Sequence, residues 1–422
     1  MKIGLFGTFD IGNFGDVLFP LVAQAMLQRA RPGTQLELYS YRPKSSANWY
    51  YDVLPIQSLP ERLGSLDLVL VGGGHLLHGN RYMAAGYGPT DPSIPHPFGF
   101  WWLPVMAAAM ARVPSALHGV SIDPGFPGWC EPMLKAFAET VDYPSVRDTA
   151  SQARLSGWAP SRDVTMIPDS IFSISRLIER GKLSPQCAAY FSEHGLHEKP
   201  YLIVQPSAAL RAYMPFMDRL IDLALARGWA VLELPIFAEA HNRVGVFASR
   251  PGVISATHWP EPMLLAEIIA NSAAVAGISL HLSIVASTYG IPVFRPRYAR
   301  GSKYILLDGL SNISFMDDGS ADLRDAANAY TPDRRIGQWQ ASLDQHYDRL
   351  IALAMEGSQR IERHVRGWDM LRDIPDSFRQ RRAFGERLAD VKLHARRSRH
   401  FLMAQAMPAM RWVRSAIRSR KR

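Results

Sequence analysis

Two side chains of this 422-residue chain are placed where they could bind an anion or move a proton, His281 and Arg147. His281 follows small and β-branched apolar residues, 273–278, which predict a buried parallel strand, and residues 280–287 predict the next helix. In an open α/β sheet such a junction lies at the carboxyl edge of the strands, where ligands bind. A histidine there can act as an acid or a base near neutral pH. The alternative is a polar side chain that only satisfies backbone groups at a helix start.

Arg147 stands at the carboxyl end of another predicted strand edge, residues 143–148. Its guanidinium is planar and permanently charged. Arg147 is therefore a second charged side chain at an edge where ligands bind.

A glycine-bearing loop, residues 7–16, separates the first predicted strand from a helix predicted over 17–29. Glycines let the backbone approach a ligand, and a helix start offers N–H groups to phosphate or carboxylate. The loop lacks the G-x-G-x-x-G spacing of the dinucleotide fingerprint, and Asp16 would repel an anion unless it caps the helix. A plain structural turn is the competing interpretation.

Three consecutive glycines, 72–74, follow the strand predicted over 66–71. They are costly to order, so we expect a ligand to approach the bare backbone there; a tight strand-to-helix crossing is the alternative. The segment 80–102 is irregular and rich in Gly, Pro and aromatic residues, which suits the faces and hydroxyls of a sugar but could also pack a lid. The expected saccharide residues are Gly73, Gly74, His75 and His78.

The elements that must position these residues form two series of alternating strands and helices. The first has strands predicted at 2–7, 35–41, 66–71, 115–122, 143–148 and 164–167, and a short helix over 149–156 that Gly157 closes. The second has strands at 201–204, 230–234, 253–254, 273–278 and 293–294, with helices at 217–226 and 262–271. We predict an α/β protein of two facing Rossmann-like domains with an active cleft between their carboxyl edges. The expected boundaries are 1–175 for the N-terminal domain, 176–199 for a connector, 200–335 for the C-terminal domain and 336–422 for a helical, basic extension.

Composition narrows the class of protein. Hydrophobic residues make up 47% and charged residues 20% of the chain, as in a folded globular protein. Cys130 and Cys187 stand far apart without zinc-ligand spacing, which favours a reducing compartment and gives no reason to expect a metal. The first residues lack an apolar signal core, and no apolar run reaches the roughly 20 residues that span a bilayer. A cytoplasmic location is expected.

The basic charge lies in the tail. Net charge is +9, and residues 379–422 hold 14 Lys and Arg against two acidic residues. Arginines alternate there with Met, Leu, Phe and Trp, which is typical of helices on an anionic membrane surface. A solvated, frayed tail is the alternative, and no recognition motif supports binding to nucleic acid.

Several short motifs together resemble the polysaccharide pyruvyl transferase family over about the first 320 residues. They are residues 12–16 (Gly-Asn-Phe-Gly-Asp), 72–74 (Gly-Gly-Gly), 119–122 (Gly-Val-Ser-Ile), 145–148 (Ser-Val-Arg-Asp) with Ser151, Pro168-Asp169, 279–281 (Ser-Leu-His) and 290–292 (Gly-Ile-Pro). The resemblance implies two Rossmann-like domains arranged as in GT-B glycosyltransferases. It also implies transfer of pyruvate from phosphoenolpyruvate onto a sugar as a ketal.

In this family an arginine of an Arg-Asp motif and an arginine-leucine-histidine element bind the donor and supply acid–base chemistry. Arg147 and His281 match those positions, so the resemblance makes them the candidate catalytic residues, whereas Ser279 stands where the family has an arginine. A donor that carries phosphate and carboxylate together suits planar, permanently charged arginines. Ser279 can donate a hydrogen bond but cannot replace a cation. We expect Arg295, Arg297, Arg300 or Lys303 to supply the missing charge. The expected donor-binding residues are Arg147, Ser279, Asn13, Gly15, Arg295 and Arg297.

The sequence thus predicts a pyruvyl transferase of surface-polysaccharide assembly that is peripheral to the membrane and needs no cofactor, because phosphoenolpyruvate is a co-substrate. Its expected partners are a saccharide acceptor, free or lipid-linked, and an anionic membrane surface, but not nucleic acid. His281, as imidazolium, is expected to protonate the methylene carbon of the donor. Two alternatives stay open: a GT-B-type glycosyltransferase that uses a nucleotide sugar, and a saccharide-binding relative in which Ser279 marks lost catalysis.

Overall fold

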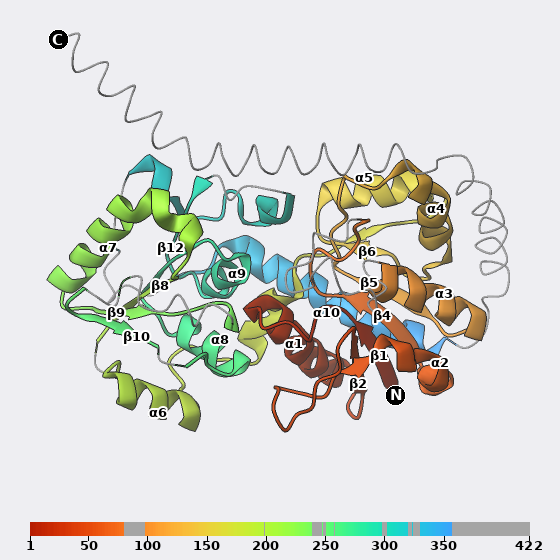
Figure 1. The fold of residues 1–422 in the computed structure, drawn as a ribbon, viewed down its shortest axis with the longest axis horizontal. Coiled ribbons are helices and arrows are strands. Elements are labelled where there is room, and N and C mark those ends of the chain that lie inside the picture. Colours follow the sequence, from red (N-terminus) through yellow and green to blue (C-terminus); the bar gives the residue numbers. More distant parts are fainter. Residues whose placement is uncertain are drawn as a thin grey trace, which may run out of the picture.

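The chain folds into two α/β units that lie side by side, each built on a parallel sheet (Figure 1). The computed structural model describes residues 1–79, 98–197, 199–238, 247, 250–256, 258–297, 302–319, 323 and 330–356. Most of the aromatic segment 80–102 and the whole basic tail 379–422 lie outside the described residues.

The first sheet has the strand order β3-β2-β1-β4-β5, and all its neighbouring strands are parallel. Its inner strands are almost continuously apolar because helices cover both faces of the sheet. The strands are β1 (Lys2–Phe6), β2 (Gln35–Ser40), β3 (Leu54–Pro55), β4 (Leu68–Gly72) and β5 (Ser115–His118). The helices of this unit are α1 (Phe14–Ala30), α2 (Leu59–Arg62), α3 (Trp102–Ala111), α4 (Glu131–Thr140) and α5 (Thr149–Trp158).

Three local predictions for this unit are wrong in detail. Helix α1 starts three residues earlier than expected, because the side chain of Asn13 accepts the N–H of Gly15 and caps the helix. Gly157 does not close α5 but lies inside it, since the N–H of Ala159 still donates to the carbonyl of Leu155. The strands predicted over 143–148 and 164–167 are shorter than expected, β6 (Ser145–Val146) and β7 (Thr165–Met166), and they pair with each other.

The second sheet has the order β10-β9-β8-β11-β12-β13, again with parallel neighbours. Its strands are β8 (Tyr201–Val204), β9 (Ala230–Glu233), β10 (Val253–Ser255), β11 (Ala274–Ala276), β12 (Val293–Arg295) and β13 (Ile313–Phe315). Its helices are α6 (Pro185–His194), α7 (Met214–Ala226), α8 (Pro262–Ala270) and α9 (Leu280–Thr288). The expected α/β class with two Rossmann-like units is confirmed.

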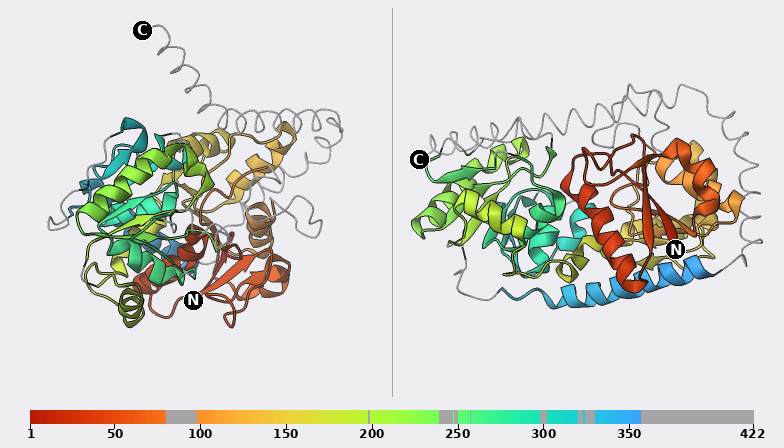
Figure 2. Two further views of the ribbon diagram at one scale, coloured as in Figure 1. Left: turned by 60° about the vertical axis from the view of Figure 1, so that its left-hand side comes forward. Right: turned by 90° about the horizontal axis from the view of Figure 1, so that it is seen from below.

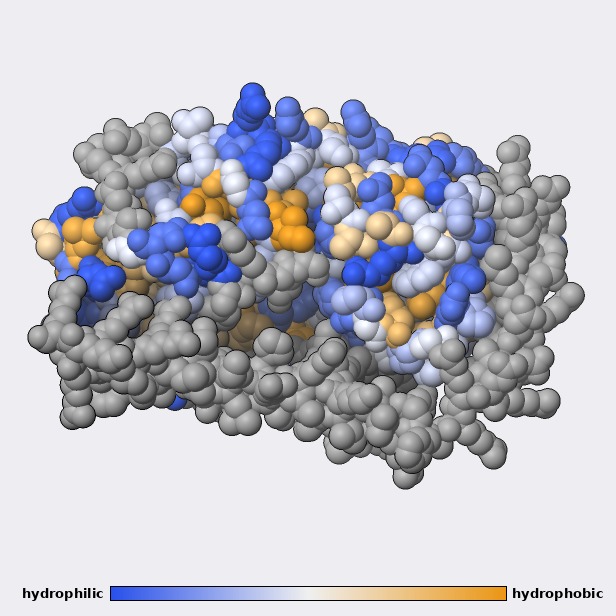
Figure 3. Space-filling model, turned by 90° about the horizontal axis from the view of Figure 1, so that it is seen from above, coloured by the Kyte–Doolittle hydropathy of each residue, from blue (hydrophilic) through white to orange (hydrophobic). Residues whose placement is uncertain are grey.

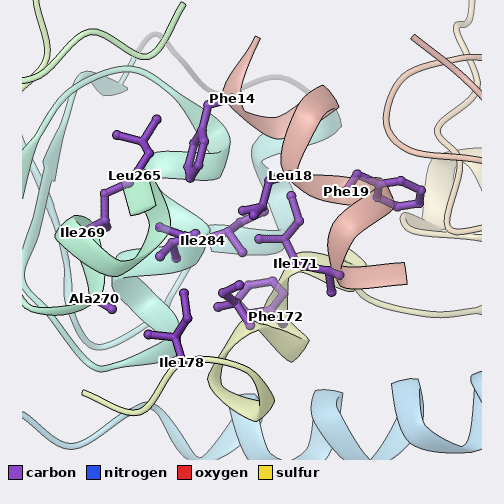
Figure 4. Packing of buried hydrophobic residues seen from close by; sticks show 14 of the residues in the cluster. Phe14, Leu18, Phe19, Ile171, Phe172, Ile178, Leu265, Ile269, Ala270 and Ile284 are labelled. Atoms are coloured by element: carbon purple, nitrogen blue, oxygen red, sulfur yellow. The ribbon is translucent and has the colours of Figure 1, made fainter. Parts of the chain in front are cut away.

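An apolar core joins the two units (Figure 4). Phe14 and Leu18 of α1 pack with Leu265 of α8 and Ile284 of α9, and all four side chains are fully buried. The short 3₁₀ helix η5 (Ser170–Arg176) adds further apolar side chains, Ile171 and Phe172 among them. Burial of apolar surface stabilises the folded state by about 25 cal/mol per Å². Separating the two units would expose this shared core, so the core holds the facing ends of the two sheets in a fixed relation.

The last described helix, α10 (Arg334–Met355), follows the second sheet in sequence but runs along the first unit (Figure 2). The side-chain amide of Gln340 donates to the carbonyl of Phe172 at 3.0 Å. Further along, Nε2 of His346 lies 2.7 Å from Nδ1 of His118, which ends β5. Helix α10 therefore ties the C-terminal part of the fold to the N-terminal sheet.

The described surface on the face shown in Figure 3 mixes polar and apolar residues without one continuous apolar area. Among the described residues, α3 carries two of the large exposed apolar side chains, Leu103 and Met110, and the others lie in different parts of the chain: Met166, Phe237, Ile305 and Met355. Within the described ranges, none of the helices combines the length and the apolar character that a membrane span requires.

Candidate active site

The candidate site lies where the strand order of each sheet changes direction. That point falls between β1 and β4 in the first sheet and between β8 and β11 in the second. In open α/β sheets, ligands bind at the carboxyl ends of the strands at this switch point. The loop after β1 carries Thr8 and Asp10, and Gly73 and Gly74 follow β4. In the second sheet, Gln205 follows β8 and Ser279 follows β11.

The two units meet at this point through Gly15 and His281. Gly15 lies in the first turn of α1 and His281 in the first turn of α9. A Cβ atom on Gly15 would overlap the imidazole ring of His281, so only glycine allows the ring to approach the helix. Two helix N-termini therefore converge here, and the partial positive charge at each favours a bound anion.

Arg147, Asp169 and His281 form a connected charged group across the two units. Nη1 of Arg147 donates to Oδ2 of Asp169 at 2.9 Å, and both side chains are about 95% buried. Nε2 of His281 lies 3.7 Å from the same carboxylate oxygen. Asp169 thus brings together the two candidate catalytic residues, which stand far apart in the sequence.

Arg147 is held in place by a second set of hydrogen bonds. Its Nε donates to Oγ of Ser121 at 2.6 Å, and that hydroxyl donates to Oδ2 of Asp148 at 2.8 Å. Asp148 also caps α5 by accepting the N–H of Ser151 at 2.8 Å. The Arg-Asp pair of the sequence motif therefore has two tasks: the arginine enters the site, and the aspartate fixes both the arginine and the following helix.

The environment of Asp169 favours its ionised form. Burial alone would raise the pKa of this carboxyl, but the neighbouring His281 and Arg147, with the backbone N–H of Ile171, hold it well below its usual range. A carboxylate is therefore present beside His281 at every physiological pH.

Asp16 has the opposite environment. It lies in the first turn of α1, and its Oδ1 accepts a hydrogen bond from the hydroxyl of Thr8 at 2.7 Å. Burial raises the pKa of Asp16 to about 6, against the opposing effects of the Thr8 hydrogen bond and the charge of His281. The site thus holds two carboxyls, Asp16 and Asp169, with pKa values pushed in opposite directions, which is typical of acid–base sites.

Ser279, which replaces the arginine of the family motif, caps α9. Its hydroxyl accepts the N–H of Leu282 at 3.4 Å, and its own N–H donates to the side-chain oxygen of Gln205 at 2.9 Å. Gln205 also accepts the N–H of Ile278. The serine therefore orients the helix that carries His281 but brings no positive charge.

The arginines expected to compensate for Ser279 have other surroundings. Arg295 is 1% exposed, and its guanidinium stacks over the ring of Tyr304 at 4.3 Å. Arg297 is paired with Asp318 at 2.5 Å, and its backbone N–H donates to Asp317. Arg300 and the side chain of Lys303 lie outside what the structure describes. The described arginines of this loop are therefore engaged within the second unit.

The expected saccharide residues follow β4 in the first unit. Gly73 and Gly74 have φ angles of +93° and +102°, a conformation that side chains disfavour. Nε2 of His75 lies 3.4 Å from Asp123, and the rings of His75 and buried His78 stack with their centroids 6.5 Å apart. A Cβ atom on Gly74 would lie 3.9 Å from Oδ1 of Asp16, so the glycine segment passes beside the site around His281.

Asn13 approaches the second unit through the loop before α1. It forms an antiparallel bridge with Phe237, and the neighbouring N–H of Phe14 donates to the carbonyl of Ile236. Its side chain serves as the N-cap of α1. Asn13 and Gly15 thus shape the contact between the units, as well as being candidates for donor binding.

Sequence reasoning found Asp169 only as part of a Pro-Asp motif, without a role, and expected Asp16 either to repel an anion or to cap the helix. Asp169 follows a predicted strand and caps the next turn by accepting the N–H of Ile171. An aspartate in such a position is usually explained by the cap alone. Its contact with His281 depends on the packing of two units. Within the described residues, no group of three or more His, Cys, Asp or Glu side chains is arranged to hold a metal ion.

A family model described as polysaccharide pyruvyl transferase matches residues 13–295, more than half of the chain. No curated protein matches the sequence.

Among solved structures, the UDP-GlcNAc 2-epimerase of Methanocaldococcus jannaschii is similar, with a TM-score of 0.56 and 10% identity over 85% of this chain and 100% of that one. A UDP-GlcNAc 2-epimerase from Neisseria meningitidis bound to UDP-GlcNAc has a TM-score of 0.48 and 11% identity over 88% and 99% of the two chains. The first likeness shows the fold, two facing Rossmann-like domains of the GT-B type.

Proposed function

Because the chain belongs to the polysaccharide pyruvyl transferase family and is an enzyme of the transferase class, we propose that it moves the pyruvyl group of phosphoenolpyruvate onto a saccharide. The product is a ketal, in which two hydroxyls of one sugar bind the same carbon. The acceptor belongs to a surface polysaccharide or its precursor.

The observation that carries the donor proposal is the convergence of Arg147, His281 and two helix N-termini on one point. Gly15 and His281 touch, so the first turns of α1 and α9 both face the same space. Arg147 reaches this group through Asp169. A small molecule with phosphate and carboxylate groups is the kind of ligand that such a set of cationic and N–H groups favours.

In the proposed reaction, His281 as imidazolium gives a proton to the methylene carbon of the donor. A C–H bond forms, and the neighbouring carbon becomes electrophilic enough for a first saccharide hydroxyl to add. The bond from that carbon to the phosphate oxygen then breaks, and a second hydroxyl adds. Of the two hydroxyl protons released, one restores His281 and the other leaves with phosphate. Asp169, held ionised, lies 3.7 Å from Nε2 of His281, so a negative charge faces the ring that gives the proton.

The acceptor is proposed to lie along Gly73 and Gly74, beside His75 and His78. Both glycines have positive φ angles, Gly74 is partly exposed, and the two stacked imidazoles border the same loop. The ketal ring contains the pyruvyl carbon, two sugar oxygens and the sugar carbons that join them. The two hydroxyls must therefore be on adjacent sugar carbons or on carbons separated by one more. The acceptor must therefore offer such a pair.

The test uses ¹³C-labelled phosphoenolpyruvate and a panel of nitrophenyl hexosides with free neighbouring hydroxyl pairs. We expect release of inorganic phosphate together with a ¹³C methyl resonance of a ketal on the sugar. His281→Gln should lose both signals while keeping its fold by circular dichroism. Wild-type turnover by that variant would remove His281 from the mechanism.

A glycosyltransferase that uses a nucleotide sugar is the second candidate. Ser279 favours it, since the hydroxyl caps α9 and supplies no charge for a phosphate and a carboxylate together. The similar epimerase fold is compatible with this candidate but does not select it. Binding of a nucleoside diphosphate without binding of phosphoenolpyruvate would favour it.

The proposed place of action is the cytoplasmic face of a membrane. Support comes from the sequence of the basic tail, residues 379–422, in which arginines alternate with apolar side chains. Flotation with vesicles of anionic lipids should recover the full chain but not a chain that lacks residues 379–422. Equal recovery of the two would contradict membrane association.

A further inference from the structure

Asp16 is a carboxyl group beside the proposed donor site that the steps above leave without a task. From the sequence, Asp16 was expected beside an anion only if it capped the helix. In the structure Asn13 is the cap of α1, and Asp16 lies in the first turn. Its side chain is partly buried, and Oδ1 accepts the hydroxyl of Thr8 at 2.7 Å. Capping therefore does not explain why a carboxyl group stands at this point.

The position of Asp16 connects the two proposed substrate regions. Gly15, its neighbour in the chain, packs against the imidazole of His281. On the other side, a Cβ atom on Gly74 would lie 3.9 Å from Oδ1 of Asp16, and glycine at φ +102° leaves that space without a side chain. The carboxyl group thus lies next to the backbone proposed to hold the saccharide and one residue from the contact with His281.

Burial, together with the neighbouring charges, keeps both forms of Asp16 accessible near neutral pH. His281 and Arg147 favour the carboxylate, and Asp10 disfavours it. Burial has the largest effect and brings the pKa of Asp16 to about 6. A group that transfers protons works best when its pKa lies near the working pH.

We propose that Asp16 is the catalytic base that takes the proton of the first saccharide hydroxyl and returns it to the departing phosphate. This inference rests on the proposed function. The O–H bond of the hydroxyl breaks as its oxygen binds the electrophilic carbon, and the proton passes to the carboxylate of Asp16. When the bond between carbon and phosphate oxygen breaks, the protonated Asp16 gives that proton to phosphate. The second hydroxyl returns a proton to His281, so both residues end in their starting forms.

Two variants separate catalysis from structure. Asp16→Asn keeps the size of the side chain and an oxygen for the Thr8 hydrogen bond, but it cannot accept the proton. Thr8→Val keeps the shape of Thr8 and removes the hydrogen bond that stabilises the carboxylate of Asp16. Phosphoenolpyruvate binding is measured by calorimetry, and phosphate release is measured from pH 5 to 9 with the nitrophenyl hexosides.

We expect Asp16→Asn to bind phosphoenolpyruvate within a few-fold of wild type and to lose phosphate release by about 10²-fold or more. Thr8→Val should move the acidic limb of the kcat/KM profile to higher pH. Release by Asp16→Asn at a rate near wild type, or an unmoved limb in Thr8→Val, would overturn the assignment of Asp16 while the proposed function stands. Failure of the wild-type protein to bind phosphoenolpyruvate would overturn both.

Wild-type protein could bind phosphoenolpyruvate and yet use none of the hexosides. In that case an NMR titration of the Asp16 carboxyl group tests the assignment of Asp16. The resonance of Asp16 in ¹³C-aspartate-labelled protein is identified by its absence from Asp16→Asn. A midpoint near 6 that rises in Thr8→Val supports the assignment. A midpoint at the ordinary aspartate value of about 4 overturns it.

Discussion

Gly15 of the first unit lies against the imidazole ring of His281 of the second, and a Cβ atom at Gly15 would overlap that ring. This contact brings the first turns of α1 and α9 together and sets the position of the candidate acid–base histidine. A glycine in a helix is conformationally costly, by about 0.5–1 kcal/mol relative to alanine. Its presence at position 15 is explained by the ring that it admits.

Gly15→Ala should therefore impair the site more than the fold. Overlap with the imidazole must be relieved by moving His281 or separating the helices, which costs about 1–3 kcal/mol. We expect a lower free energy of unfolding in urea and loss of most phosphate release. Gly337→Ala is the matched control, because Gly337 lies within α10 and a Cβ atom there would meet nothing within 4 Å. That variant should be as stable as wild type or more so, and equal behaviour of the two would contradict the packing argument.

Breaking the buried ion pair of Arg147 and Asp169 should lower the free energy of unfolding by a large amount. Removing one partner of a buried ion pair leaves an uncompensated charge, which costs about 3–5 kcal/mol. Arg147→Ala should lower the free energy of unfolding by about this amount. The exposed pair of Arg349 and Glu356 provides the comparison, and Arg349→Ala should cost about 0–1 kcal/mol. Similar losses in urea denaturation for both variants would show that the Arg147 pair contributes little.

Asp16 should destabilise the fold at neutral pH. Its pKa is raised to about 6, so the folded protein binds its proton more tightly than the unfolded chain does. Stability from this group is present below the unfolded value of about 4 and is lost as the pH rises through about 6. Asp16→Asn should thus be more stable than wild type at pH 8, and the difference should shrink toward pH 4. A variant less stable than wild type at pH 8 would contradict this sign.

The histidine pair between β5 and α10 should make the fold sensitive to acid. His118 and His346 are buried, their nitrogens are 2.7 Å apart, and burial lowers the pKa of His118 to about 4. The unfolded chain takes up protons first, so stability is lost as the pH falls from about 6.5 to about 4.

His346→Phe should remove part of this pH dependence. It should also cost about 1–3 kcal/mol at pH 8, because a buried nitrogen of His118 loses its partner. Thermal unfolding at pH 8, 6 and 5 measures both effects. His258→Gln, at an exposed position, is the control and should follow the wild-type curve. An identical slope for His346→Phe and wild type would mean that another group causes the acid sensitivity.

Local patterns predicted the fold class and the strand ends that carry Arg147 and His281. Apolar runs between glycine and proline signals are enough to place β8 (Tyr201–Val204), whose predicted bounds match the structure. Strands β3 and β13, of two and three residues, are too short to show a period and were missed. Gly157 misled the prediction for α5 because a glycine is also tolerated inside a helix.

The parts of the site that depend on packing could not be read from the sequence. The contacts of Asp169 with His281 and of Gly15 with the same ring join residues of two units, and no local pattern records such pairs. The pKa of Asp16 likewise follows from burial at that contact. Ser279 could be identified as a departure from the family motif, but its task as the cap of α9 required the structure.

The central claim, that phosphoenolpyruvate is the donor, is tested most directly by calorimetry with phosphoenolpyruvate and with UDP, GDP and CMP as competitors. Wild-type protein should bind phosphoenolpyruvate, the nucleotides should not displace it, and His281→Gln and Arg147→Lys should bind it more weakly while remaining folded. Arg147→Lys keeps the charge but loses the geometry that bonds Ser121 and Asp169 together, so it tests the guanidinium itself. No binding of phosphoenolpyruvate, with clear binding of one nucleotide, would contradict the account and favour a nucleotide-sugar donor.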